Sequence, residues 1–210
     1  MFIDENSSDE NKSDISILSR DQQILLYTID YLTKWVRGGD HFLQIPEERT
    51  WIKELPLWAV IYYQIVKGTY ETYDYAPTSI QFFGRSSFTV NLSYEGVDDI
   101  EDLRELEIID KIRLSTSQHG FVTAYRITDY GKKLLVLIPK DVKDEVHGLF
   151  YCEHCKTHLN FLMNIGDEPE IRIDCPECDV SDFELAFLES EDVSYISEPY
   201  FLRISKKLVG

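Results

Sequence analysis

The chain has 210 residues, of which 43% are hydrophobic and 13% aromatic, so it can bury a substantial core and is not globally disordered. Its formal net charge of −17 repels polyanions at long range, which disfavours nonspecific nucleic-acid binding. Such a charge suits a neutral or basic protein partner, and solubility alone is the other explanation for it. The composition therefore points first to a soluble protein that contacts other proteins.

Membrane insertion and secretion are not expected. The longest apolar run, residues 57–63, is far shorter than the roughly 20 residues needed to cross a bilayer. The first ten residues become acidic early and lack the basic start and long apolar stretch of a secretory signal. We expect an intracellular protein, in the cytoplasm or the nucleus.

The first 14 residues hold five acidic side chains and one basic one, so we expect residues 1–17 to form a disordered, solvated leader. Ser19 and Gln22 have the spacing of a capping box and predict the start of a helix that reaches about Val36. The glycine pair at 38–39 would end it. Its predicted apolar stripe consists of Leu25, Ile29, Leu32 and Val36.

Residues 40–55 are predicted to be a polar connector. Pro56 suits the first turn of a second helix over residues 57–66, which is apolar on nearly every side and should lie in the core. Residues 69–95 are rich in aromatic side chains and are predicted to contain a strand over 88–92. Those side chains either pack against the core or form a stacking or peptide-binding surface, and packing is favoured. They are Tyr70, Tyr73, Tyr75, Phe82 and Phe83.

The next stretch, residues 97–139, predicts a helix, two strands and another helix. Val97, Ile100 and Leu103 share one face of the first helix, which ends near residue 107. Residues 108–114 and 121–127 are predicted strands, joined by a polar turn at 115–120. Thr128 or Asp129 can cap the last helix, and Pro139 would stop it.

Two strings in this stretch resemble the end of a winged helix-turn-helix domain. They are Leu106-Glu107-Ile108-Ile109 before the hairpin and Tyr125-Arg126-Ile127-Thr128-Asp129-Tyr130-Gly131 after it. The resemblance implies that the helix before the hairpin is the recognition helix and that the hairpin is the wing. We further expect that the strands of the wing do not belong to a larger sheet. We expect an α+β fold in which residues 18–145 form a winged-helix domain with an insertion at about 69–95.

All four cysteines lie in two C-x-x-C pairs, and they are Cys152, Cys155, Cys175 and Cys178. In a reducing compartment, the spacing C-x2-C-x19-C-x2-C predicts a tetrahedral zinc site closed by four thiolates. We expect a zinc ribbon over residues 146–185, one structural Zn2+ ion, and a strand or tail at 186–210. The alternatives are His154 or His158 in place of a sulfur, an iron–sulfur centre, and a thioredoxin-like redox pair.

The charges around the predicted wing suggest two different surfaces. Residues 97–107 carry six acidic side chains against Arg104, which would make entry between two phosphate strands unfavourable. The predicted protein-docking residues are Asp98, Asp99, Glu101 and Asp102. Binding to DNA would instead use Lys111, Arg113, His119, Arg126, Lys132 and Lys133, although these cations can equally form a solvated face.

These observations favour a non-enzymatic interaction protein, an adaptor in a transcription or other nucleic-acid-handling assembly. A winged helix followed by a zinc ribbon is similar in order to the general transcription factor E family. A winged-helix DNA-binding regulator is the alternative, and a redox or other enzyme is the least favoured, because His41, His119 and His147 are scattered. No small-molecule substrate is evident. Replacing Cys155 or Cys175 with serine is expected to unfold the ribbon and leave the first domain largely intact.

Overall fold

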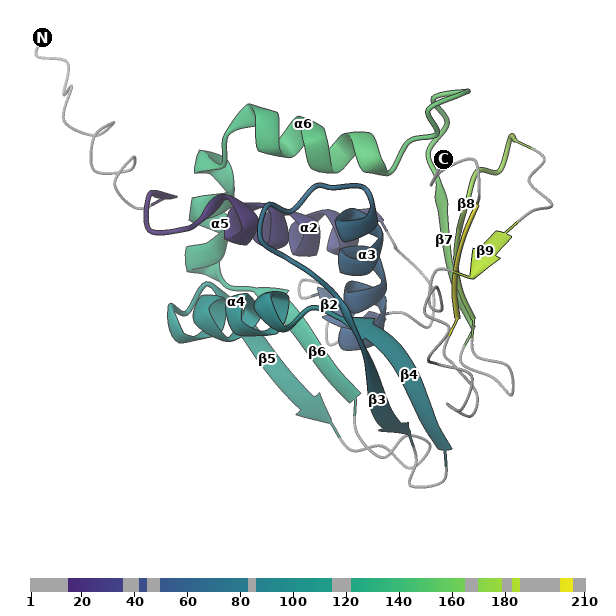
Figure 1. Ribbon diagram of the computed structural model, residues 1–210. Helices are drawn as coiled ribbons and strands as arrows, with labels where there is room; N and C mark the ends of the chain where they lie inside the picture. The colour runs from purple at the N-terminus through teal and green to yellow at the C-terminus, as the bar shows by residue number, and fades with distance from the viewer. Residues whose placement is uncertain are drawn as a thin grey trace, which may run out of the picture.

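The computed structural model describes residues 15–35, 42–44, 50–82, 86–114, 122–164, 170–178, 183–185 and 201–205. This part of the chain has an α+β fold with five helices (Figure 1). The predicted leader falls almost entirely outside it, as do the glycine pair at 38–39 and the turn at 115–120.

Helix α2 (Arg20–Trp35) begins at the predicted capping box. The backbone N–H of Gln22 donates to the hydroxyl oxygen of Ser19 over 3.1 Å, and the N–H of Ser19 donates to the Gln22 side-chain oxygen over 3.1 Å. The reciprocal bonds satisfy donors that the first turn of a helix leaves unpaired. The start of the helix is therefore confirmed, and three members of the predicted stripe, Leu25, Ile29 and Leu32, are fully buried.

The prediction of a connector over residues 40–55 is wrong. This segment contains strands β1 (Phe42–Gln44) and β2 (Thr50–Lys53), which pair with each other antiparallel. Strand β2 also pairs with β6 (Val122–Ile127), with Ile52 opposite Tyr125. A strand this short depends on a partner some 70 residues away in sequence, which local periodicity does not reveal.

Helix α3 (Glu54–Val66) is buried along most of its length, as its composition predicts. Pro56 lies in the first turn, where a missing backbone N–H has little cost. The helix ends at Val66 with Lys67 as its C-cap residue. Gly68, which follows, has a φ of +72° in the left-handed region that favours glycine.

Strands β3 (Ala76–Phe82) and β4 (Ser86–Leu92) form an antiparallel hairpin that is a sheet of its own. The predicted strand at 88–92 is the second half of β4, and β3 was not predicted. Tyr70 and Tyr73 are buried with their rings stacked 4.0 Å apart, so these two aromatic residues pack the segment against the core. Tyr75 is partly exposed and meets the edge of Tyr62.

The predicted helix–strand–strand–helix order is confirmed as α4 (Tyr94–Glu105), β5 (Ile109–Leu114), β6 and α5 (Asp129–Leu137). Helix α4 starts before the predicted Val97, because the hydroxyl of Ser93 caps it by accepting from the N–H of Gly96. The expectation of a wing with no larger sheet is wrong. Strand β6 pairs with β5 on one edge and with β2 on the other, which gives a four-stranded sheet in the order β1-β2-β6-β5.

Helix α6 (Lys140–Leu149) was not predicted. Pro139 stops α5, as expected, and is also the N-cap residue of α6. Val142 and Val146 are buried, and Glu145 forms an ion pair with Arg20 of α2. These contacts place α6 along α2 (Figure 1).

The last four strands, β7 (Asn160–Asn164), β8 (Glu170–Asp174), β9 (Phe183–Leu185) and β10 (Phe201–Ser205), form a second four-stranded sheet. Strands β7 and β8 lie between the two cysteine pairs and pair antiparallel. The order is β7-β8-β10-β9, and β10 pairs parallel to β8. The C-terminal strand therefore joins this sheet and not the sheet that contains β5 and β6.

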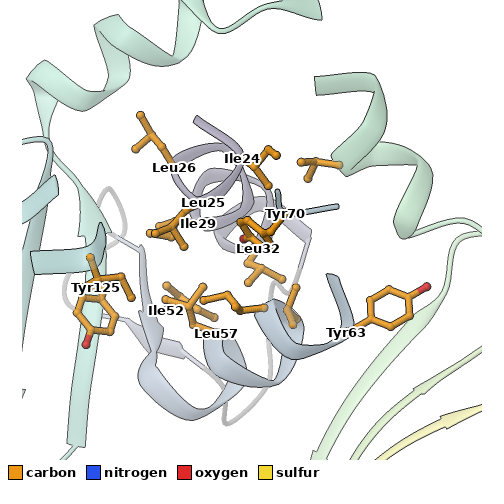
Figure 2. Close-up of a cluster of buried hydrophobic side chains, with 14 of the residues drawn as sticks. Ile24, Leu25, Leu26, Ile29, Leu32, Ile52, Leu57, Tyr63, Tyr70 and Tyr125 are labelled. Carbon is orange, nitrogen blue, oxygen red and sulfur yellow. The ribbon is translucent and has the colours of Figure 1, made fainter. Parts of the chain in front are cut away.

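The hydrophobic core surrounds α2 (Figure 2). In this view Leu25 and Ile29 of α2 lie above Ile52 and Leu57, while Tyr125 and Tyr63 lie at opposite sides of the cluster. Burial of side chains of this size stabilises a fold by roughly 1.5–3 kcal/mol each. Because the same cluster contains Cys152 and Cys175, the core reaches the predicted metal site.

Candidate metal centre

The fold brings the four predicted cysteines together. Cys152 and Cys155 follow the end of α6, and Cys175 and Cys178 follow β8. Their sulfur atoms all lie within 4.8 Å of one another. Two cross-pair distances are 3.6 Å (Cys152 to Cys178) and 3.4 Å (Cys155 to Cys175). A tetrahedron with zinc–sulfur bonds of about 2.3 Å has sulfur–sulfur edges of about 3.8 Å. The cluster therefore has the size of a four-thiolate metal site.

A tight turn holds each pair in this arrangement. The N–H of Cys152 donates to the carbonyl oxygen of Thr157 over 2.8 Å, and the N–H of Lys156 donates back to the carbonyl oxygen of Cys152 over 2.9 Å. Lys156 takes a φ of +59° to close this turn. In the second pair, the N–H of Cys178 donates to the sulfur of Cys175 over 3.4 Å. Hydrogen bonds to sulfur favour the thiolate form that binds a metal.

The four thiols differ in their acidity. Hydrogen bonds from Thr157 lower the pKa of Cys155 to about 6. The neighbouring thiols, Cys152 first, raise the pKa of Cys178 to about 12, and burial raises the pKa of Cys175. Four sulfurs this close cannot all be negatively charged unless a cation offsets them. A bound divalent cation would supply that charge, and it would leave no open position for a substrate or a catalytic water.

Histidine does not take part in this cluster. Among the described residues, the group that could hold a metal consists of the four cysteines. The Nε2 atom of His158 lies 2.7 Å from the hydroxyl of Tyr31, and its Nδ1 atom lies 2.9 Å from the carbonyl oxygen of Leu159. Both ring nitrogens of His158 thus have partners already, which argues against its replacing a sulfur.

The metal site is packed against the first helices. Tyr31 of α2 stacks on Phe150 with ring centroids 4.5 Å apart, and burial raises its pKa to about 12. The hydroxyl of Tyr63 on α3 donates to the carbonyl oxygen of Leu149 over 3.0 Å, and Lys67 forms an ion pair with Glu153 over 3.6 Å. No local pattern in the sequence predicts these contacts, because the residues that make them are far apart along the chain.

The predicted docking residues of α4 do not share one environment. Asp98 and Asp102 are exposed. Asp99 is half-buried and accepts from Tyr73 over 2.7 Å and from Gln22 over 2.9 Å, and burial raises its pKa. This carboxylate ties α4 to the core and is poorly placed to meet a partner.

Glu101 lies between two cations. It forms ion pairs with Lys111 over 2.7 Å and with Arg104 over 2.6 Å, and the hydrogen bond from Lys111 is the main reason why its pKa is lowered. Glu101 therefore links α4 to β5.

The cations proposed to touch DNA mostly face carboxylates of their own region. Arg126 pairs with Asp110 on β5 and lies 4.6 Å from the centre of the Trp51 ring, and Lys132 pairs with Asp129. Arg113 and Lys133 are exposed. His119, like His41, lies outside the described residues, and His147 bonds to the hydroxyl of Tyr27 over 2.7 Å.

Fold and site together define an α+β protein with a four-cysteine cluster that could hold one metal ion. A family model described as the Uncharacterized protein MJ1567 family matches residues 21–177, about three quarters of the chain. The chain belongs to that family. No curated protein matches the chain, and no solved structure matches it.

The family match begins in α2 and ends between Cys175 and Cys178, so it spans the first helices and most of the metal site together. Among the helices in the described part of the chain, none combines the length and the apolar character required to span a membrane.

Proposed function

We propose that this protein is a non-enzymatic adaptor, in which a winged-helix domain and a structural zinc site form one rigid body that docks on another macromolecule through the exposed face of α4. The proposal has three parts, which are the fold type, the metal and the docking surface. Each has its own support.

The order of elements supports the winged helix. Helix α2, strand β2, helices α3 and α4, and strands β5 and β6 follow the helix–strand–helix–helix–strand–strand order of that fold, and β2 pairs with β6 as the first strand of such a domain does. The larger sheet thus adds β1 to a winged-helix arrangement. The β3–β4 hairpin lies between the second and third helices, at the place of the predicted insertion.

The residues Thr128 to Gly131, which end the second string of the winged-helix resemblance and open α5, have a physical role in this arrangement. The hydroxyl of Thr128 donates to the carbonyl oxygen of Glu107 over 2.7 Å and accepts from the N–H of Gly131 over 3.0 Å. A Cβ atom at Gly131 would lie 2.2 Å from the carbonyl oxygen of Ile108, so α5 approaches the start of β5 as closely as glycine allows. The string therefore joins the end of α4 to the start of α5.

Zinc is the metal that the donor set favours. Four sulfur ligands in a tetrahedral cluster suit zinc or an iron centre, and two matched C-x-x-C turns around one ion are typical of structural zinc. The residues that would hold it are Cys152, Cys155, Cys175 and Cys178. Bound zinc would offset two of the four negative charges of the thiolates and fix both turns.

The observation that carries the adaptor proposal is the distribution of charge. Asp98, Asp102 and Glu105 line the exposed face of α4, where a DNA-reading helix would need donors. Lys111, Arg126 and Lys132, which would contact phosphates, are already paired with carboxylates. A protein partner with basic side chains suits this surface better than a phosphate backbone does. Placing that partner in a transcription assembly depends on the module order shared with general transcription factor E.

Site-specific cross-linking in extract from the native cell tests the proposal. A photoreactive residue at Tyr94, which is exposed at the start of α4, should capture a protein, whereas the same residue at Val136 on α5 should not. Replacing Asp98 and Asp102 with asparagine should abolish the capture. Replacing Lys132 and Lys133 with glutamine is the matched control and should leave it unchanged.

A gel-shift assay across a salt series tests the alternative of a DNA-binding regulator. A regulator that makes several phosphate contacts must bind duplex DNA with an affinity that falls steeply as salt rises. Such binding, weakened by the lysine variant and not by the aspartate variant, would overturn the adaptor proposal.

A further inference from the structure

Strand β5 is an edge strand of the first sheet. The strand order β1-β2-β6-β5 leaves one side of β5 without a partner strand among the described residues, and no drawn element lies along that side in Figure 1. An open edge carries backbone N–H and C=O groups that can pair with an added strand. This edge lies beside α4, to which the ion pair between Lys111 and Glu101 joins it, but it offers backbone groups where the exposed face of α4 offers carboxylates.

The side chains of β5 exclude one obvious occupant, a second copy of the chain. An antiparallel pair related by a two-fold axis places one residue of the strand opposite its own copy. In the two registers that pair most of β5, Lys111 would face either itself or Arg113. Like charges directly opposite each other destabilise a pair of strands, and edge lysines are a common device against self-association.

The same side chains favour a different occupant, which is an added strand with acidic residues at alternate positions. Lys111 and Arg113 are exposed and two residues apart, so they share one face of the strand. Lys111 already pairs with Glu101, so carboxylates at alternate positions of an added strand would share Lys111 with Glu101 and would also meet Arg113. Asp110 and Ile112 share the other face and suit a basic and an apolar residue. An open hollow of about 460 Å³ lies at the start of β5. Ile109 lines it together with mostly polar side chains, among them Arg104, Glu107 and Lys111, and it has room for a side chain opposite Ile109.

We propose that the free edge of β5 binds an extended acidic segment of a partner protein by adding a strand to the sheet. An antiparallel segment would place an acidic residue opposite Arg113, an apolar one opposite Ile112, an acidic one opposite Lys111, a basic one opposite Asp110 and an apolar one opposite Ile109. Backbone pairing would supply affinity and the alternating charges would supply specificity. This surface is a second docking site, and its test does not depend on the face of α4.

The test uses the metal-loaded protein and a labelled peptide, TEVEKVT with blocked ends, which carries this pattern. Its charge-swapped counterpart, TKVKEVT, should bind at least tenfold more weakly in fluorescence anisotropy. A version of TEVEKVT with N-methyl groups on alternate amides keeps the charges but cannot pair as a strand. Its affinity should also be at least tenfold lower than that of TEVEKVT. Amide exchange in β5 should slow when TEVEKVT binds.

Charge reversal gives the matched variants. Lys111→Glu with Arg113→Glu should weaken TEVEKVT at least tenfold and should make TKVKEVT the better ligand. Arg113→Glu alone should change both affinities in the same direction. It should disturb the fold less, because it keeps Lys111, which pairs with Glu101. Lys132→Glu with Lys133→Glu makes the same change of charge on α5 and should alter the affinity less than twofold.

Each contrary result overturns the proposal. Equal binding of the N-methylated peptide would mean that charge alone holds the ligand, and an equal effect of the α5 variant would mean that the site is not on β5. A dimer that dissociates in the Arg113→Glu variant would assign the edge to a second copy. Duplex DNA that binds through Lys111 and Arg113 while TEVEKVT does not would assign it to phosphates.

Discussion

Two regions of this molecule reach a defined structure by different means. The wing region, residues 94–137, is held by apolar packing, two helix caps and the close approach of Gly131 to Ile108. The metal region, residues 150–178, has few apolar side chains of its own among those described and gathers four thiols within 4.8 Å. The first region is specified largely by contacts between its own residues, whereas the second gathers four cysteines that could hold a metal ion, and we expect such an ion to stabilise it.

The two regions nevertheless share one core. Cys152 and Cys175 belong to the cluster that α2 and α3 build, and Tyr31 of α2 stacks on Phe150 beside the first cysteine turn. The expectation that a lost metal site leaves the first domain largely intact is therefore revised. We now expect the loss to reach α2 and α6 while sparing the wing region.

The largest effect should follow removal of a buried ligand. Structural zinc contributes about 10 kcal/mol or more of apparent binding free energy in small domains, so Cys175→Ser should abolish stoichiometric metal binding and disorder residues 150–178. Hydrogen exchange should quicken in α6 and the second half of α2, around Tyr31. Cys155→Ser, at an exposed ligand, should also release the metal.

The control for this experiment is the wing region, whose exchange in α5 and β6 should change little. Retention of one metal ion per chain in both variants would count against the four-thiolate site. Unchanged exchange at Tyr31 would show that the two regions are independent after all.

In the wing region, Gly131→Ala should be the most damaging small change. The added Cβ would lie 2.2 Å from the carbonyl oxygen of Ile108 and 2.7 Å from Cγ2 of Ile127, and backbone on one side leaves it no room. We expect a loss of about 3–5 kcal/mol in the free energy of unfolding, measured with urea.

Gly148→Ala is the matched control, because a Cβ there would meet nothing within 4 Å and the residue lies in α6. Its expected gain is about 0.5–1 kcal/mol from helix propensity. If both substitutions had similar effects, the close approach of α5 to β5 would be wrong.

Two left-handed residues allow a smaller comparison between the regions. Glu107 and Lys156 both have a φ of +59°, the first at the end of α4 and the second in the first cysteine turn. The N–H groups of Glu107 and Ile108 donate to the carbonyl oxygens of Arg104 and Leu103, which is the pattern of a Schellman motif that usually contains glycine.

Glu107→Gly should therefore raise the free energy of unfolding by about 0.5–1 kcal/mol, because glycine relieves the strain of a left-handed backbone. Lys156→Gly should give a similar gain when metal is bound and little when it is absent. Equal gains with and without metal would show that the cysteine turn forms without its ion.

The smallest expected effect is an acid-dependent one. The hydrogen bond from Lys111 lowers the pKa of Glu101 in the folded state, so this carboxylate stabilises the fold fully above its unfolded pKa of about 4.3. That contribution should disappear as the pH falls through the lower folded pKa. Because the pair is partly exposed, its size should be about 0.5 kcal/mol or less.

Glu101→Gln checks this sign. The difference in the free energy of unfolding between wild type and variant should be present at pH 6 and should shrink towards pH 3. Metal release at acid pH affects both proteins alike and cancels in the difference. A difference that grows towards pH 3 would reverse the assignment of Glu101.

Local signals in the sequence predicted much of this fold. Three predictions depend on neighbouring residues alone, and all three are confirmed. They are the capping box at Ser19 and Gln22, the helix α3 that is apolar on nearly every side, and the two strands of the wing, β5 and β6. Helix α6 could also have been predicted, since Val142 and Val146 have helical spacing after Pro139. The cysteine spacing likewise predicted the group of four cysteines that could hold a metal ion, because the two residues between the cysteines of each pair are a local signal.

What the sequence did not reveal depends on distant partners. Strands β1 and β2 are three and four residues long, and β2 is positioned by its pairing with β6, where Ile52 lies opposite Tyr125. In the sequence Asp99 resembles a surface charge, yet in the structure Tyr73 and Gln22 both donate hydrogen bonds to it. Such contacts pair single residues across the chain and leave no periodic pattern.

The strand order of the second sheet has a consequence for how the protein is made. Strand β10 is the last of its four strands in sequence, yet it lies inside the sheet between β8 and β9. During synthesis, both cysteine pairs leave the ribosome before this strand does, so an ion can be captured while the sheet still lacks one of its inner strands. Because parallel pairing with distant residues forms slowly, insertion of β10 should be the late step in maturation, after metal loading.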